Sequence, residues 1–132
     1  MRRAAPLLIL LLLASCGPKS QYIQRPGSFS VLDSKAYDFL MYAQEIISGA
    51  RSQFIAGQLP ESARGPLEDS ITLYNALRTS WQTYRAFLVA DRTPAAANVQ
   101  HLERQLRSLS LLIVDLIQNS TQTHDASTGR SL

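Results

Sequence analysis

The chain has few of the residues from which metal centres and nucleophilic active sites are built. Its 132 residues include one cysteine, Cys16, and two histidines, His101 and His124. Neither histidine has a second His, Cys or carboxylate at ligand spacing, so the sequence predicts no metal site and no cofactor. The serines and threonines lack a strand-to-helix elbow with a base beside it. We therefore predict no catalytic residues and a protein that is not an enzyme.

A strong charge of one sign is also missing. The formal net charge is +3, but Arg2 and Arg3 lie in a leader-like segment. From Cys16 onward, eleven basic residues face ten acidic ones, which leaves a net charge of +1. The remaining arginines are spread along the chain without the clustered stripe that phosphate binding requires, so a nucleic-acid partner is not expected.

The longest apolar run, Ala4 to Leu13, is too short to span a bilayer stably as a helix. Two arginines precede this run, and the small residues Ala14 and Ser15 follow it. This layout is typical of a secretory signal peptide, which we predict over residues 1–15.

The cysteine lies directly after that segment, and Leu13-Ala14-Ser15-Cys16 resembles the lipobox of bacterial lipoproteins. The resemblance implies that the Cys16 sulfur carries a diacylglycerol and that cleavage leaves Cys16 as the first residue, so that the membrane becomes a partner through the lipid. Because Gly17 is not aspartate, the resemblance implies the periplasmic leaflet of the outer membrane in a Gram-negative cell. Surface display remains an alternative, as does outward display in a Gram-positive cell. The competing interpretation is an ordinary signal peptide followed by an unpaired thiol.

The rest of the chain divides into a tether, one domain and a tail. Prolines and glycines predict a flexible, extended tether over residues 16–29. A helical domain is predicted over residues 30–119. The polar residues 120–132 predict a disordered tail.

Apolar residues recur in the domain at alternating spacings of three and four, which indicates helices. The first helix is predicted over about 34–57, with Ser30 or Asp33/Ser34 as cap and Gly57 as exit. The second is predicted over about 66–90 and the third over about 94–119, with Thr93 as cap and Pro94 in the first turn. Similar lengths and short loops favour an all-α fold, an antiparallel three-helix up-down-up bundle.

Some apolar residues lie off these stripes, where polar residues would be expected. In an up-down-up bundle, five of them gather at one end, and we predict a partner surface there: Ile55, Leu59, Leu111, Val114 and Ile117. The alternative is that the tether folds back over this surface, or that a second copy of the chain covers it.

These features favour a membrane-anchored, non-enzymatic docking or scaffolding module for an envelope protein. Pilotins, small accessory lipoproteins of the outer membrane, are similar in layout. The alternative function is a helical carrier or sensor that opens around an amphiphilic ligand, which would require an internal cavity.

Overall fold

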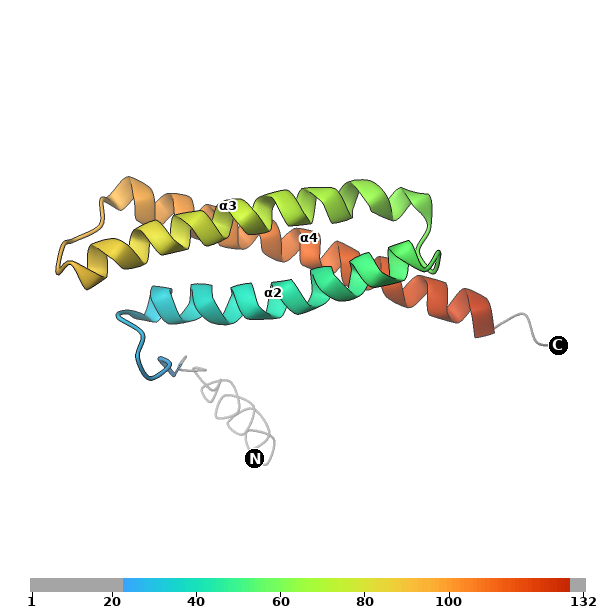
Figure 1. The fold of residues 1–132 in the computed structure, drawn as a ribbon, viewed down its shortest axis with the longest axis horizontal. Coiled ribbons are helices and arrows are strands. Elements are labelled where there is room, and N and C mark those ends of the chain that lie inside the picture. Colours follow the sequence, from blue (N-terminus) through green and yellow to red (C-terminus); the bar gives the residue numbers. More distant parts are fainter. Residues whose placement is uncertain (1–22, 129–132) are drawn as a thin grey trace, which may run out of the picture.

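Three long helices and no strand make up residues 23–128, the part of the chain that this computed structural model describes. Helix α2 spans Val31–Ile55, α3 spans Arg64–Val89 and α4 spans Ala96–Thr128, and a short 3₁₀ helix, η1, covers Glu61–Ala63. Figure 1 shows α2 and α4 running in the same direction and α3 running in the opposite direction. The predicted all-α, up-down-up bundle is confirmed.

The core forms where the apolar stripes of the three helices meet. From α2 it takes Leu40, Ala43 and Ile47, at the predicted spacing. The largest apolar side chains that are completely buried come from the other two helices: Leu77, Leu102, Leu109, Ile113 and Leu116. Burial of these stripes, rather than helix propensity alone, stabilises helices of this kind.

Helix α2 starts and ends on the expected signals. Ser30 is the N-cap, and its hydroxyl accepts a hydrogen bond from the Asp33 amide at 3.0 Å. After the helix, Gly57 adopts a φ of +71°, which an L side chain rarely adopts. The Gly57 and Gln58 amides donate to the Phe54 and Gln53 carbonyls, so the last turn is closed by a left-handed exit.

All three helices begin elsewhere than predicted, and α2 starts at Val31 rather than at about residue 34. Helix α3 starts at Arg64, two residues before the expected Pro66, because proline is tolerated within a first turn, where its missing N–H has no acceptor. Helix α4 starts at Ala96, and the Asn98 and Val99 amides donate to the Ala95 carbonyl. The expected cap at Thr93, with Pro94 at the first helical position, is therefore wrong.

The predicted tail is also wrong over residues 120–128, because α4 continues to Thr128. The sequence contains no glycine or proline between Pro94 and Gly129 that would stop it. The Ser120 and Thr121 hydroxyls donate to the Leu116 and Ile117 carbonyls one turn back, so these polar residues are accommodated within the helix. In Figure 1, α4 projects beyond the end of α2.

The predicted tether ends earlier than residue 29. Arg25 to Phe29 form a turn in which the Ser28 amide donates to the Arg25 carbonyl and Gly27 has a φ of +83°. This turn is hydrogen-bonded to α2, so it belongs to the folded domain. The predicted signal peptide at 1–15, Cys16 and residues 129–132 lie outside the described residues. Among the helices of residues 23–128, none is long and apolar enough to cross a membrane.

Candidate functional site

The structure exposes three of the five residues of the predicted partner surface. Ile55 is 76% exposed, Leu111 is 71% exposed and Val114 is 47% exposed. On α4, their neighbours Leu109 and Ile113 are almost completely buried, so one face of this helix supports the core while another presents aliphatic side chains to solvent. Ile55 is the last residue of α2, whereas Leu111 and Val114 lie near the middle of α4.

Leu59 and Ile117 do not belong to that surface. Leu59 is only 7% exposed, because the chain turns back after Gly57 and packs this side chain into the core beside Ala63. Ile117 is half-buried against the same core. The partner surface is therefore reduced to Ile55, Leu111 and Val114, which we call the distal patch.

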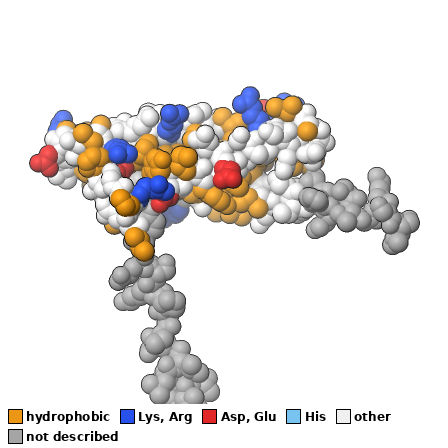
Figure 2. Space-filling model, turned by 60° about the horizontal axis from the view of Figure 1, so that its bottom comes forward, with side chains coloured by type: hydrophobic (Ala, Val, Ile, Leu, Met, Phe, Trp, Pro, Cys, Tyr) orange, Lys and Arg blue, Asp and Glu red, His pale blue; other side chains and the backbone are white. Residues whose placement is uncertain are grey.

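An open groove lies between α2 and α4. Its volume is about 470 Å³, and it contains the apolar side chains of Leu32, Phe39 and Leu106. Its charged lining residues are Lys35, Glu103 and Arg107. Figure 2 shows a band of hydrophobic side chains on the face turned toward the viewer, with basic side chains beside part of this band. The groove is a surface feature, since the interior between the helices is filled by the core.

Sequence reasoning missed a buried polar cluster at the other end of the bundle. Asp33 is fully buried, and its carboxylate accepts a hydrogen bond from the Trp81 indole N–H at 2.8 Å and one from the Phe29 amide at 2.9 Å. The Ser30 hydroxyl also bonds the Tyr84 hydroxyl, at 3.0 Å. These contacts attach the start of α2 to the last turns of α3.

The signal for this cluster was present in the sequence. Continuing the 4,3 spacing of the first apolar stripe backwards from Leu40 and Ala36 places Asp33 on the buried face. A carboxylate at that position requires donors, because a buried charge without hydrogen bonds is costly. The sequence could not show that Trp81, 48 residues away, supplies one of them.

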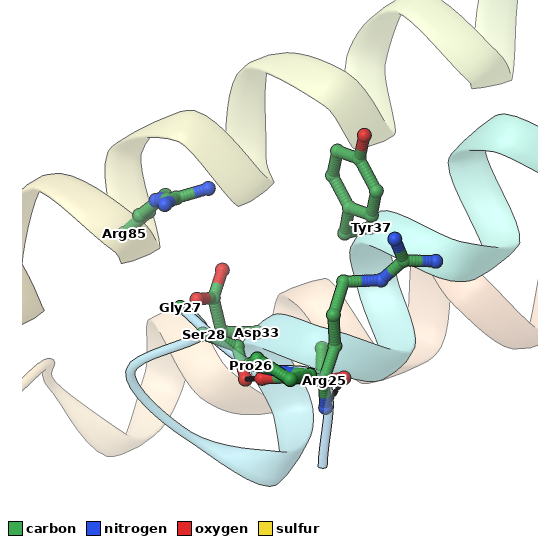
Figure 3. Close-up of a pocket in the computed structure, with 8 residues that line it drawn as sticks. Arg25, Pro26, Gly27, Ser28, Asp33, Tyr37 and Arg85 are labelled. Atoms are coloured by element: carbon green, nitrogen blue, oxygen red, sulfur yellow. Dashed lines mark hydrogen bonds between the residues drawn. The ribbon is translucent and has the colours of Figure 1, made fainter.

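A small hollow lies beside this cluster, with a volume of about 240 Å³. Figure 3 shows Arg85 on α3 facing Arg25 and Tyr37 across it, with Asp33 between them. Both oxygens of the carboxylate already accept hydrogen bonds from groups of the chain itself. The arrangement therefore suits holding the chain in place rather than acid–base or nucleophilic chemistry.

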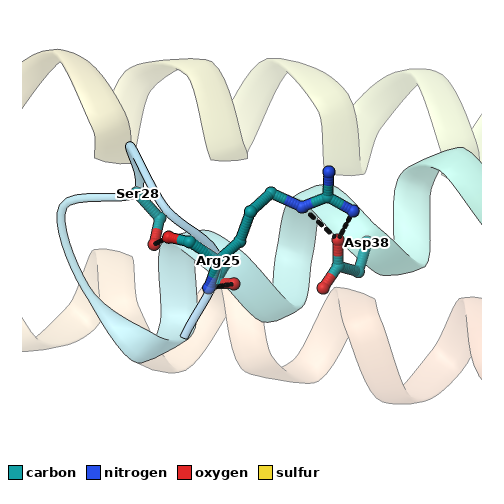
Figure 4. Close-up of polar contacts among 4 residues, drawn as sticks. Arg25, Ser28 and Asp38 are labelled. Atoms are coloured by element: carbon teal, nitrogen blue, oxygen red, sulfur yellow. Dashed lines mark hydrogen bonds and ion pairs between the residues drawn. The ribbon is translucent and has the colours of Figure 1, made fainter. Parts of the chain in front are cut away.

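Arg25 clamps the N-terminal turn onto α2 (Figure 4). Its guanidinium forms an ion pair with Asp38, with the Nε to Oδ1 distance at 2.8 Å, and lies 4.9 Å from the Tyr37 ring centre. Its amide donates to the buried Ser34 hydroxyl at 2.8 Å, and Ser28 hydroxyl donates to its carbonyl. The chain therefore leaves the domain at a fixed point.

The described side chains that could bind a metal ion do not come together in a site. His101 is exposed on α4, as predicted, and within residues 23–128 no three His, Cys, Asp or Glu side chains come together as a metal site. The strongest shifts in pKa belong to a surface pair at the start of α3. There, the hydrogen bond and ion pair with Arg64 lower the pKa of the Glu61 carboxyl and raise that of Arg64. Both side chains are solvent-exposed, so this pair marks a helix start rather than a reactive centre.

Comparison with known proteins identifies no relative: the chain matches no protein family, no curated protein and no solved structure.

Proposed function

We propose that this protein is a lipid-anchored envelope protein whose helical bundle docks on, or scaffolds, another envelope protein without catalysing a reaction. The anchor is the acylated Cys16, as the lipobox-like sequence Leu13-Ala14-Ser15-Cys16 implies. Two or more acyl chains on one cysteine make attachment effectively permanent. With Gly17 after the cysteine, the proposed location in a Gram-negative cell is the periplasmic leaflet of the outer membrane.

The observation that carries the docking role is the distal patch. Leu111 and Val114 are exposed on α4 although the core at this level is already complete, with Leu109 and Ile113 buried. Folding therefore does not require aliphatic side chains at these two positions. Apolar side chains exposed together on a surface commonly mark the site of a partner.

The filled interior favours docking over the alternative role as a carrier or sensor of an amphiphile. A carrier needs an enclosed apolar cavity with a few polar groups directed into it. Leu77, Leu102 and Leu109 are each completely buried between the helices, and the α2–α4 groove opens on the surface. Docking by an external apolar surface requires no opening of this core.

Replacing Cys16 tests the anchor. The Cys16→Ser variant is expected to remain an unprocessed precursor or to become soluble, because a hydroxyl cannot replace the thiolate in acyl transfer. Membrane fractionation and the intact mass of the purified protein measure this. A variant with normal mature mass that stays with the membranes would refute the anchor.

A double substitution tests the distal patch. Leu111→Lys with Val114→Lys is expected to preserve helicity and membrane attachment but to abolish association, because it puts charge in an apolar contact surface. The matched control is Met41→Lys with Tyr42→Lys, since these α2 side chains are also about half exposed.

Cross-linking in cells, followed by isolation from the membranes, measures association for both variants, and sedimentation measures self-association. The proposal predicts that only the α4 double variant loses its cross-linked species. If both variants keep it, or if the α4 variant unfolds, the distal patch is not a docking surface.

A further inference from the structure

A second group of apolar side chains is exposed at the opposite end of the bundle, where the N-terminal segment joins α2. Val89, in the last turn of α3, is 63% exposed, and Phe29 is half exposed. Ile23 and Val31 are exposed at the same end. We call these four residues the proximal patch: Ile23, Phe29, Val31 and Val89.

Two arginines, Arg85 and Arg92, lie at the same end of the bundle as the proximal patch and form no ion pair within residues 23–128. The Arg85 guanidinium lies 5.2 Å from the ring centre of Phe29, and Arg85 lines a shallow surface hollow together with Val89. Arg92, in the α3–α4 loop, lies 5.2 Å from the ring centre of Phe87. Within residues 23–128, neither guanidinium forms an ion pair, so both charges are available to an anionic surface.

The length of chain between Cys16 and the domain limits how far this end can lie from a membrane. Residues 17–22 separate Cys16 from Ile23. At its fullest extension, a stretch of that length spans at most about 25 Å. The Arg25 clamp fixes the exit point at the start of α2, so the chain adds no further reach beyond that turn.

We propose that the proximal patch rests on the surface of the lipid bilayer, with its apolar side chains at the boundary between headgroups and acyl chains and with Arg85 and Arg92 facing anionic headgroups. This inference rests on the lipid anchor of the proposed function. Aromatic and aliphatic side chains flanked by arginines are the composition of interfacial membrane contacts. The bundle then stands on the bilayer, and Ile55, at the far end of the 25-residue α2, lies about 37 Å from the start of that helix.

The test uses the mature acylated protein, which begins at Cys16, reconstituted into vesicles of phosphatidylethanolamine and phosphatidylglycerol. A solvent-sensitive fluorophore is attached to Val89→Cys in one variant and to Ile55→Cys in the matched control, since both are exposed aliphatic positions at helix ends. Ala90→Cys, also exposed, provides a second proximal position. Lipids with a spin label near the top of the acyl chain serve as the quencher.

The proposal predicts that spin-labelled lipid quenches the fluorophore at residues 89 and 90. Emission there should fall at least roughly twofold, because interfacial side chains lie about 5–10 Å into the headgroup boundary. Emission at residue 55 should not change. Quenching at residue 55 as well would mean that the bundle lies along the bilayer, and this result would overturn the proposal.

Failure of the proposal and failure of the anchor give different results. Protein that floats with the vesicles but shows no quenching at residues 89 and 90 retains its anchor and overturns the bilayer contact alone. A blue-shifted emission at residue 89 without quenching by lipid would mean that protein covers the patch, which also overturns it. Protein that fails to float and lacks the mass of the acyl chains refutes the anchor itself.

Discussion

Replacing Asp33 by asparagine changes the shape of the side chain little, but it is expected to destabilise the bundle strongly. The buried carboxylate accepts two hydrogen bonds, from the Trp81 indole and the Phe29 amide. An asparagine can direct its oxygen to only one of these donors, and its NH₂ group then faces the other. The substitution also removes a negative charge from the first turn of α2, where the helix dipole favours it.

The size of the effect follows from these contacts. A hydrogen bond to a charged group contributes about 1.5–3 kcal/mol, and an unsatisfied buried donor costs about 1–3 kcal/mol. Allowing for partial relaxation, we expect a loss of about 2–4 kcal/mol in the free energy of unfolding. In a domain of this size, that loss lowers the melting temperature by roughly 10–25 °C.

Circular dichroism at increasing temperature measures the loss, and fluorescence reports on its location, because Trp81 is the only tryptophan in the chain. Asp38→Asn is the control, since Asp38 forms a partly exposed ion pair with Arg25 that is expected to contribute about 0–1 kcal/mol. A double-mutant cycle with Trp81→Phe should give a coupling free energy of about 1–3 kcal/mol between the two side chains. Equal melting temperatures for Asp33→Asn and Asp38→Asn, or a coupling near zero, would refute the assigned role of Asp33.

Three further substitutions, the first with Arg104→Ala as its control, test the packing and the backbone conformation at two glycines. Leu109→Ala is expected to lower the free energy of unfolding by about 2–5 kcal/mol, because this side chain is completely buried. Arg104→Ala, on the exposed face of α4, should change thermal stability little. Similar losses for the two variants would contradict the assigned helix register. Gly57→Ala is expected to cost about 1 kcal/mol because of its positive φ, measured by chemical denaturation. Gly49→Ala, in the exposed middle of α2 with open space at its Cβ, should instead stabilise by roughly 0.5–1 kcal/mol, and a change of the same sign at both glycines would disprove this explanation.

The sequence by itself determined the helices and their order. Apolar residues such as Leu40, Ala43 and Ile47 are spaced three and four apart, so they lie on one face of a helix. This pattern is local, and it can therefore be found in the sequence alone. Ser30 and Gly57 ended up in the roles that their local chemistry favours, as cap and as left-handed exit. The polar composition of residues 120–128 predicts a tail, but α4 continues to Thr128 because no helix breaker occurs before Gly129.

Only the tertiary structure decided which side chains are covered and which polar groups find partners. The sequence predicts Leu59 as a surface residue, but the turn after Gly57 places its side chain in the core. The buried Asp33 carboxylate accepts a hydrogen bond from the Trp81 indole, 48 residues away in the chain. The spacing alone places Leu111 off the apolar stripe, whereas the exposure of Val89 depends on how the neighbouring helices are placed. Which side chains share a helix face is set by their spacing within a few turns, whereas burial depends on distances between segments that are remote in the chain, and no local pattern contains those distances.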